Sequence, residues 1–313
     1  MSSPLDSTMG IWLVSLFLAT ILYGMGLIQA FLYFNWYTKD HWGVKAVVIC
    51  LVILETLHIT FFFCGTYWIL IDHFGDFAAL VVITWYDSAQ LLAGYLSAFT
   101  VQMYFAYCIY ALSPKYKIMP MFIAALALLQ IGAGLAQTII TTELGSFTLL
   151  DKTKRITTLQ AASAFACDVS ITACLCYTLN GKRTGLKSTN SLLNTLMIIA
   201  VNRGMLTALS AALNIILFLS IPNTFWFFLG LILSGKLYMN SMLATLNTRQ
   251  HIRGRLNEDS AGPWNSIHIR NLSSNRNTNS GGTNVPEEST LNSHIDPAYE
   301  DKGNKTTFTM DMV

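Results

Sequence analysis

The chain has 313 residues, of which 53% are hydrophobic and only 12% are charged, and its mean hydropathy is +0.48. This composition is too apolar for a water-soluble globular domain and indicates an integral membrane protein. The formal net charge of +2 combines a basic part, residues 1–256, with 15 Lys and Arg against 9 Asp and Glu, and an acidic part, residues 257–313, with 4 against 8. The basic part follows from the usual excess of Lys and Arg at the cytoplasmic surface of a membrane protein, so it gives no argument for nucleic-acid binding.

Seven apolar runs follow one another along the chain. A helix that crosses the hydrocarbon layer needs about 20 predominantly apolar residues. The predicted spans are residues 9–34, 46–71, 88–112, 118–140, 158–179, 192–219 and 225–246. The sequence therefore predicts an all-α, polytopic membrane protein, a bundle of seven transmembrane helices over residues 9–249. Residues 77–86 are apolar but too short to span, so we expect an interfacial stretch or an extension of the third helix.

The distribution of basic residues predicts the orientation, because Lys and Arg gather near cytoplasmic helix ends. One side holds ten: Lys39, Lys45, Lys115, Lys117, Lys182, Arg183, Lys187, Arg249, Arg253 and Arg255. The other side holds three: Lys152, Lys154 and Arg155. We expect a short extracellular N-terminus (1–8) and a cytoplasmic C-terminus, in the plasma membrane or another membrane of the secretory pathway.

The C-terminal part, residues 250–313, is predicted to be a polar cytoplasmic tail. From Asn257 onward, 26 of 57 residues are Asn, Ser, Thr or Gly, and aromatic residues are few. Such a segment cannot bury enough apolar area to fold alone, so we expect it to be disordered. A cytoplasmic partner could bind this tail.

Five ionisable residues lie inside the predicted spans, where a charge costs about 2.5–3.5 kcal/mol at the bilayer centre. They are Glu55, His58, Asp168, Arg203 and Lys236. Counted from the predicted helix ends, all five lie near the midplane. Two acids and two bases at one depth are nearly neutral together, so we expect them to face inward and pair.

Helical periodicity adds neutral polar residues to this intramembrane belt. Thr207, Ser210 and Asn214 follow Arg203 on one face of the sixth helix, and Asn240 follows Lys236 on the seventh. Two interpretations stay open. The belt could only lock the helices together, or it could line a ligand pocket or a path for protons and ions.

The sequence lacks the residues that several kinds of functional site require. His58 is the only histidine in the spans, which argues against bis-histidine haem, and Glu55 with His58 is half of a di-iron ligand set. No G-x-S-x-G or H-E-x-x-H motif occurs, so we expect no enzyme, no metal and no cofactor. Retinal is a minor alternative, because Lys236 is the sole lysine in the spans but no acidic residue lies at the midplane of the third helix. A likeness to G-protein-coupled receptors is one of topology alone.

The stretch from Ser191 to Arg249 carries a resemblance to a known family. It contains Asn202-Arg203-Gly204, then Lys236-Leu237-Tyr238-Met239-Asn240-Ser241, and ends with Asn247-Thr248-Arg249. It resembles the seven-helix membrane proteins of mushroom-forming (basidiomycete) fungi known as domain of unknown function 6534. The resemblance implies a fungal membrane protein with seven spans and no particular activity. The motif residues it carries over are Asn202, Arg203, Lys236, Asn240, Asn247 and Arg249, of which Arg249 is expected at the cytoplasmic headgroups.

Together these observations predict a receptor-like protein that sits in a lipid bilayer and binds a small unknown ligand in an intramembrane polar cavity. The predicted site comprises Glu55, His58, Asp168, Asn202, Arg203, Lys236 and Asn240. The alternatives are a transporter or proton-linked channel that uses the same belt, and a purely structural membrane protein.

Overall fold

The structure, a computed structural model, describes residues 6–114, 117–183, 187–220 and 226–260. Within these ranges the fold is all-α, as the sequence predicts. Seven long helices are present: α1 (Ile11–Trp36), α2 (Trp42–Tyr67), α3 (Trp85–Leu112), α4 (Ile118–Leu144), α5 (Lys154–Asn180), α6 (Lys187–Ser220) and α7 (Trp226–Ser260). Residues 261–313, which hold most of the expected tail, lie outside the described residues.

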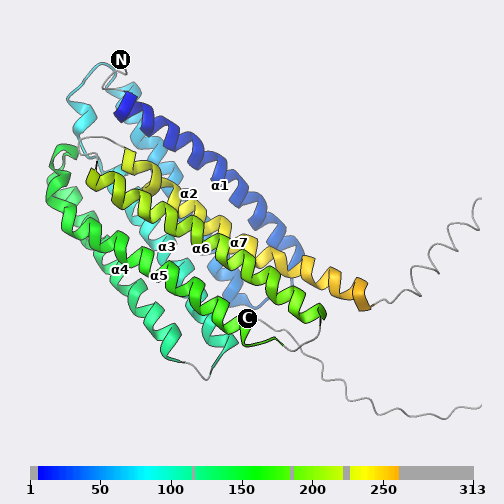
Figure 1. Ribbon diagram of the computed structural model, residues 1–313. Coiled ribbons are helices and arrows are strands. Elements are labelled where there is room, and N and C mark those ends of the chain that lie inside the picture. The colour runs from blue at the N-terminus through cyan, green and yellow to red at the C-terminus, as the bar shows by residue number, and fades with distance from the viewer. Residues whose placement is uncertain (1–5, 115–116, 184–186, 221–225, 261–313) are drawn as a thin grey trace, which may run out of the picture. The chain divides into compact units, whose positions relative to one another are not determined.

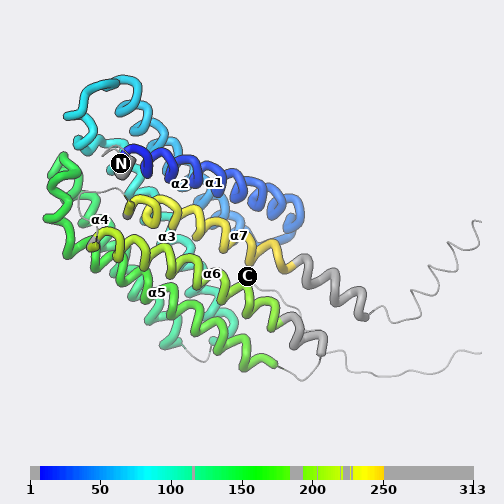
Figure 2. The backbone as a smooth tube through the Cα atoms, turned by 45° about the horizontal axis from the view of Figure 1, so that its top comes forward, coloured from blue at the N-terminus to red at the C-terminus, as the bar shows by residue number. Residues whose placement is uncertain are grey.

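The bundle belongs to one compact unit that ends at Ile252, so the last turns of α7 lie in the next unit. Successive helices run in opposite directions and lie side by side in both views (Figures 1 and 2). The starts of α1, α3, α5 and α7 therefore share one end of the bundle with the ends of α2, α4 and α6. We refer to it as the N-terminal end.

Among the residues that the structure describes, six helical segments are long and apolar enough to cross a membrane, and they correspond to α1 through α6. Their outer faces are apolar, with Phe17, Ile28 and Phe31 on α1 each more than 60% exposed. Apolar side chains that protrude at this density indicate a lipid environment. The polar residues Lys236 and Asn240 lower the hydropathy of α7, which is not among the six.

Connecting segments meet at the N-terminal end. The chain leaves α2 through a π-helical turn, η2 (Trp68–Asp72), and passes the 3-10 turn η3 (Ala79–Val81). The next residues pair with the segment after α4, where Ile83 donates a backbone hydrogen bond to Gly145. Residues 77–84 are therefore not an extension of α3, which begins at Trp85 behind a capping box formed by Thr84 and Asp87.

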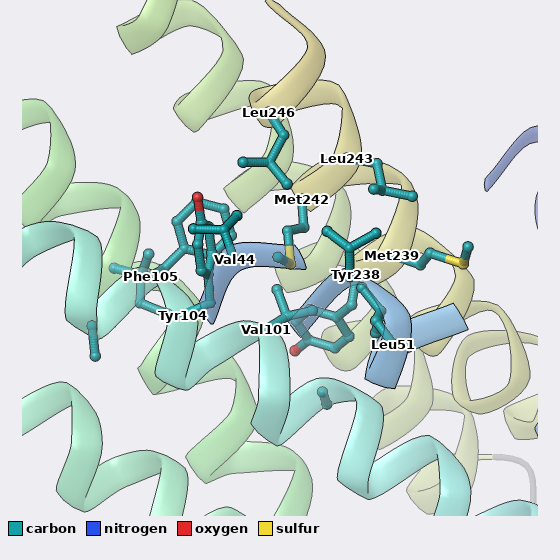
Figure 3. Packing of buried hydrophobic residues seen from close by; sticks show 14 of the residues in the cluster. Val44, Leu51, Val101, Tyr104, Phe105, Tyr238, Met239, Met242, Leu243 and Leu246 are labelled. Atoms are coloured by element: carbon teal, nitrogen blue, oxygen red, sulfur yellow. The ribbon is translucent and has the colours of Figure 1, made fainter. Parts of the chain in front are cut away.

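The apolar core centres on α7. Met239, Met242 and Leu243 are fully buried among side chains of α2 and α3, which include Leu51 and Val101 (Figure 3). Hydrogen bonds also join α7 to α1, α2, α5 and α6. The helix that carries the buried Lys236 is thus enclosed by protein on several sides, which is where a membrane protein places charged groups.

Candidate functional site

A buried ion pair between α2 and α7 forms the centre of the site. Lys236 Nζ lies 2.5 Å from Glu55 Oε2, and both side chains are 0% exposed. Ser97 of α3 donates a hydrogen bond to the other carboxylate oxygen, Oε1, at 2.5 Å. Both oxygens of the carboxylate are therefore satisfied, which is what makes a buried ion pair tolerable.

His58 completes a triad with this pair. Lys236 Nζ lies 3.0 Å from His58 Nδ1, which accepts the ammonium hydrogen bond, so the imidazole proton is on Nε2. His58 is one turn after Glu55 on α2, which places both side chains on the face toward α7. Charge from two helices is thus neutralised within one group of three residues.

Two glycines make room for the triad. A Cβ atom on Gly235 would lie 2.7 Å from Glu55 Oε1, closer than real Cβ contacts come. A Cβ on Gly94 would lie 3.2 Å from His58 Cδ2. The backbones of α7 and α3 therefore approach the α2 side chains directly, as small residues permit in membrane bundles.

Asp168 makes a second polar contact to α7. It is 0% exposed and accepts a hydrogen bond of 2.6 Å from the hydroxyl of Tyr238, two residues after Lys236. This hydrogen bond joins α5 to α7. Arg203, the other expected member of the belt, is in α6, and its side chain lies outside the described residues.

The two predicted asparagines differ in position. Asn202 is exposed on α6 and so faces away from the triad. Asn240 points toward α1, where its Nδ2 donates to the Leu22 carbonyl and its Oδ1 accepts from Gln29. Asn240 therefore joins α7 to α1, one helical turn from the triad.

Arg249, expected at the cytoplasmic headgroups, is mostly buried within the protein. Its guanidinium forms an ion pair of 2.5 Å with Asp40, in the connection between α1 and α2, and stacks over the ring of Tyr37. Arg249 lies within α7, which continues to Ser260. Its acidic partner comes from a loop, and counting basic residues along the sequence does not show such a tertiary contact.

Next to the triad, in the half of the bundle toward the N-terminal end, lies a cavity of about 80 Å³. A water needs roughly 10–15 Å³ on this measure, so there is room for several waters or a small ligand. Its walls come from α2 through α7, and His58 is part of them. Ile83, Phe147 and Leu150, from the connecting segments, line it at the N-terminal end.

Most polar groups in the cavity wall are carboxamides and hydroxyls. The expected polar stripe of α6 contributes Thr207 and Asn214 to this wall, while Ser210 bonds the Gly230 carbonyl of α7. Tyr95 donates a hydrogen bond of 2.7 Å to Oε1 of Gln137. The buried carboxamide and threonine side chains of the wall are Gln90, Gln130, Gln137, Thr141, Gln160, Thr207 and Asn214.

The cavity glutamines were not among the residues predicted from the sequence. A search for ionisable groups passes over neutral amides, although each carboxamide in an apolar span also needs a hydrogen-bond partner. The signal available was the run of glutamines in the third to fifth spans, at 90, 102, 130, 137 and 160. Ser97 was equally missed, because a serine in a membrane helix normally bonds its own backbone.

Among the described residues, no group of three or more His, Cys, Asp or Glu side chains could hold a metal ion. Residues 164–251, from the middle of α5 into α7, match the model of a family described as "Family of unknown function (DUF6534)". The match includes Asp168, Lys236 and Asn240, and it agrees with the resemblance drawn from the motifs in this region. No curated protein and no solved structure matches the chain.

Proposed function

We propose that this protein is a receptor-like, seven-span membrane protein that binds a small molecule in the cavity beside the Glu55–Lys236–His58 triad. The observation that carries the proposal is the shared wall: His58 lines the cavity and also contacts Lys236. A ligand in the cavity would therefore touch a residue whose partners hold α2 and α7 together. A ligand that prefers one arrangement of these helices would shift the population toward it.

The proposed topology has seven spans, with α7 as the seventh. Lys236 is fully enclosed and neutralised, so its charge does not oppose insertion in the way that a lipid-facing lysine would. The excess of Lys and Arg at the other end of the bundle supports an extracellular N-terminal end and a cytoplasmic C-terminal tail. The sequence motifs between Ser191 and Arg249 support a fungal origin and a place in the DUF6534 family.

A second candidate, a proton-linked transporter, is favoured by one feature of the triad. His58 has its Nε2–H on the side of Gly94 and the cavity, while its Nδ1 contacts Lys236, so a hydrogen-bonded path leads from the cavity to Glu55. Coupled groups of this kind serve as proton relays in membranes. Ligand-dependent proton flux into proteoliposomes would favour this candidate, whereas binding without flux favours the receptor.

Binding is tested by a thermal-shift screen of small polar molecules on the purified protein, with two neighbouring alanines as the comparison. Ala161 lines the cavity and is 2% exposed, whereas Ala162 is on the exposed face of the same helix. Ala161→Leu fills part of the cavity and Ala162→Leu does not. We expect at least one compound to raise the melting temperature of the wild type and of Ala162→Leu by mass action, but not that of Ala161→Leu. Equal shifts in all three proteins, or none in any, would contradict the proposal.

A further inference from the structure

We infer that the cavity takes a small organic cation, a protonated amine, with Asp87 as its counter-ion. This inference rests on the proposed binding function and names its ligand class. It follows from the unpartnered oxygen atoms in the cavity wall, the charge of that wall and its apolar remainder.

Four buried oxygens at the cavity have no hydrogen-bond partner among the described residues. They are Asp87 Oδ1, Gln90 Oε1, Gln130 Oε1 and Thr141 Oγ1, and each of these residues is more than nine-tenths buried. A buried polar atom without a partner costs about 1–3 kcal/mol. The carboxylate and carboxamide oxygens can only accept hydrogen bonds. A ligand that satisfies this set must therefore bring several donors, as a primary ammonium group does.

Asp87 brings a carboxyl group to the wall. Among the lining residues that the structure describes it is the only carboxylate, and none is Lys or Arg. The ion pairs of the described residues join other side chains, so no basic partner is assigned to it. Lys236, near His58, is already neutralised by Glu55. A buried charge needs a partner, and a bound cation supplies one.

The capping box fixes the orientation of this carboxylate. Asp87 Oδ2 accepts hydrogen bonds from the backbone N–H of Thr84 at 2.8 Å and from its hydroxyl at 2.7 Å. Two donors to one oxygen hold the carboxyl group in one orientation. They also leave Oδ1 as the atom available to a ligand.

The rest of the wall suits a hydrocarbon body. Tyr95, Phe147 and Phe228 line the cavity, and the rings of the two phenylalanines lie 5.9 Å apart. Aromatic faces attract cations as well as apolar groups. The cavity also exceeds the volume of a single water several times, so it accommodates more than a bare alkali ion. An amine with a short apolar chain is the class of ligand that uses the acceptor oxygens, the carboxylate and the apolar wall together.

The experiment compares isobutylammonium chloride with isobutanol, its neutral counterpart of similar shape, on purified full-length protein at pH 7 and constant ionic strength. Melting temperature is recorded over a concentration series for the wild type and for Asp87→Asn. Asn can still accept the two Thr84 hydrogen bonds, so the cap of α3 is kept while the charge is removed. The matched control is Asp151→Asn, since Asp151 is in η4 (Phe147–Thr153), with a side chain 67% exposed.

We expect the amine to stabilise the wild type and Asp151→Asn more than the alcohol does, and the midpoint concentration to rise about tenfold or more in Asp87→Asn. Gln130→Leu, which removes an acceptor without touching the cap, should weaken the amine effect as well. If Asp87→Asn does not fold, the Gln130→Leu variant still tests the inference.

Three results would overturn the inference. The first is equal stabilisation by amine and alcohol, and the second is an amine effect that persists in both Asp87→Asn and Gln130→Leu. The third is stabilisation by sodium chloride over choline chloride that depends on Asp87, which would assign the site to an alkali cation. In each case the proposed binding function still stands if neutral compounds give shifts that Ala161→Leu abolishes, so the two failures are distinguishable.

Discussion

At the scale of single residues, the Glu55–Lys236 pair determines how α2 meets α7. The pair is completely enclosed, and its partners Ser97 and His58 leave the carboxylate and the ammonium well bonded. Replacing an entire buried ion pair by neutral groups is often harmless, whereas removing one partner leaves an uncompensated charge. This asymmetry gives the triad a measurable signature.

We predict that Lys236→Met destabilises the protein by about 3–5 kcal/mol, because Glu55 is left buried without its partner. The double variant Glu55→Gln/Lys236→Met should recover most of that loss. Denaturant unfolding in detergent measures both values. Lys154→Met is the control, because Lys154 pairs with Asp151 on the surface and its loss should change stability by less than about 1 kcal/mol. If the double variant is no more stable than Lys236→Met, the pair is not the reason for the loss.

The residues of the triad could be predicted from the sequence because charge in a membrane span is rare and expensive. Their pairing was expected from charge balance alone. The cavity was harder to locate, since its wall is made of neutral amides and hydroxyls from several helices. Which of them meet depends on helix rotation, and no run of residues in one span encodes it.

At the scale of helices, contact between α7 and α2 depends on glycine where the backbone passes a carboxylate. Gly235 occupies that position on α7, and a methyl group there would enter the space of Glu55 Oε1. A methyl group on Gly24 of α1 would have no atom within 4 Å, so the same change there meets nothing. Substitutions at the two glycines therefore distinguish the effect of close packing from the effect of helix propensity.

We predict that Gly235→Ala lowers the melting temperature, with a cost of about 1–3 kcal/mol from overpacking. Gly24→Ala should leave stability unchanged or raise it slightly, because Ala is the better helix former. Thermal unfolding of the purified variants gives the comparison. Equal effects of the two substitutions would mean that α7 does not approach α2 closely at Gly235.

Helix boundaries were predicted less well than helix existence. The expected fifth span begins at 158, yet α5 begins at Lys154, because polar residues can form the interfacial turns of a membrane helix. For the same reason α7 continues to Ser260, past the last apolar residue of the run. Hydropathy reports the thickness of the hydrocarbon layer and not where the backbone stops being helical.

At the scale of the whole molecule, the arrangement separates an apolar exterior from a polar interior. Large apolar side chains cover the outside of α1 to α6, while charged and amide groups gather around α7 and the cavity. This distribution makes the weakly apolar α7 compatible with a membrane location, since its neighbours rather than lipid surround its polar face. It also places the cavity within reach of the N-terminal end, where the connecting segments line it.

We propose that the bundle spans the membrane and that water reaches the cavity from the extracellular side. This proposal is tested most directly by single cysteines at positions 161 and 162, in a protein whose six native cysteines are replaced by alanine, with a membrane-impermeant methanethiosulfonate added outside sealed cells. We predict that Ala161→Cys reacts, because it lines the cavity, and that Ala162→Cys does not, because it faces the acyl chains. Failure of position 161 to react, equal reaction at both positions, or reaction only from the cytoplasmic side would contradict the account.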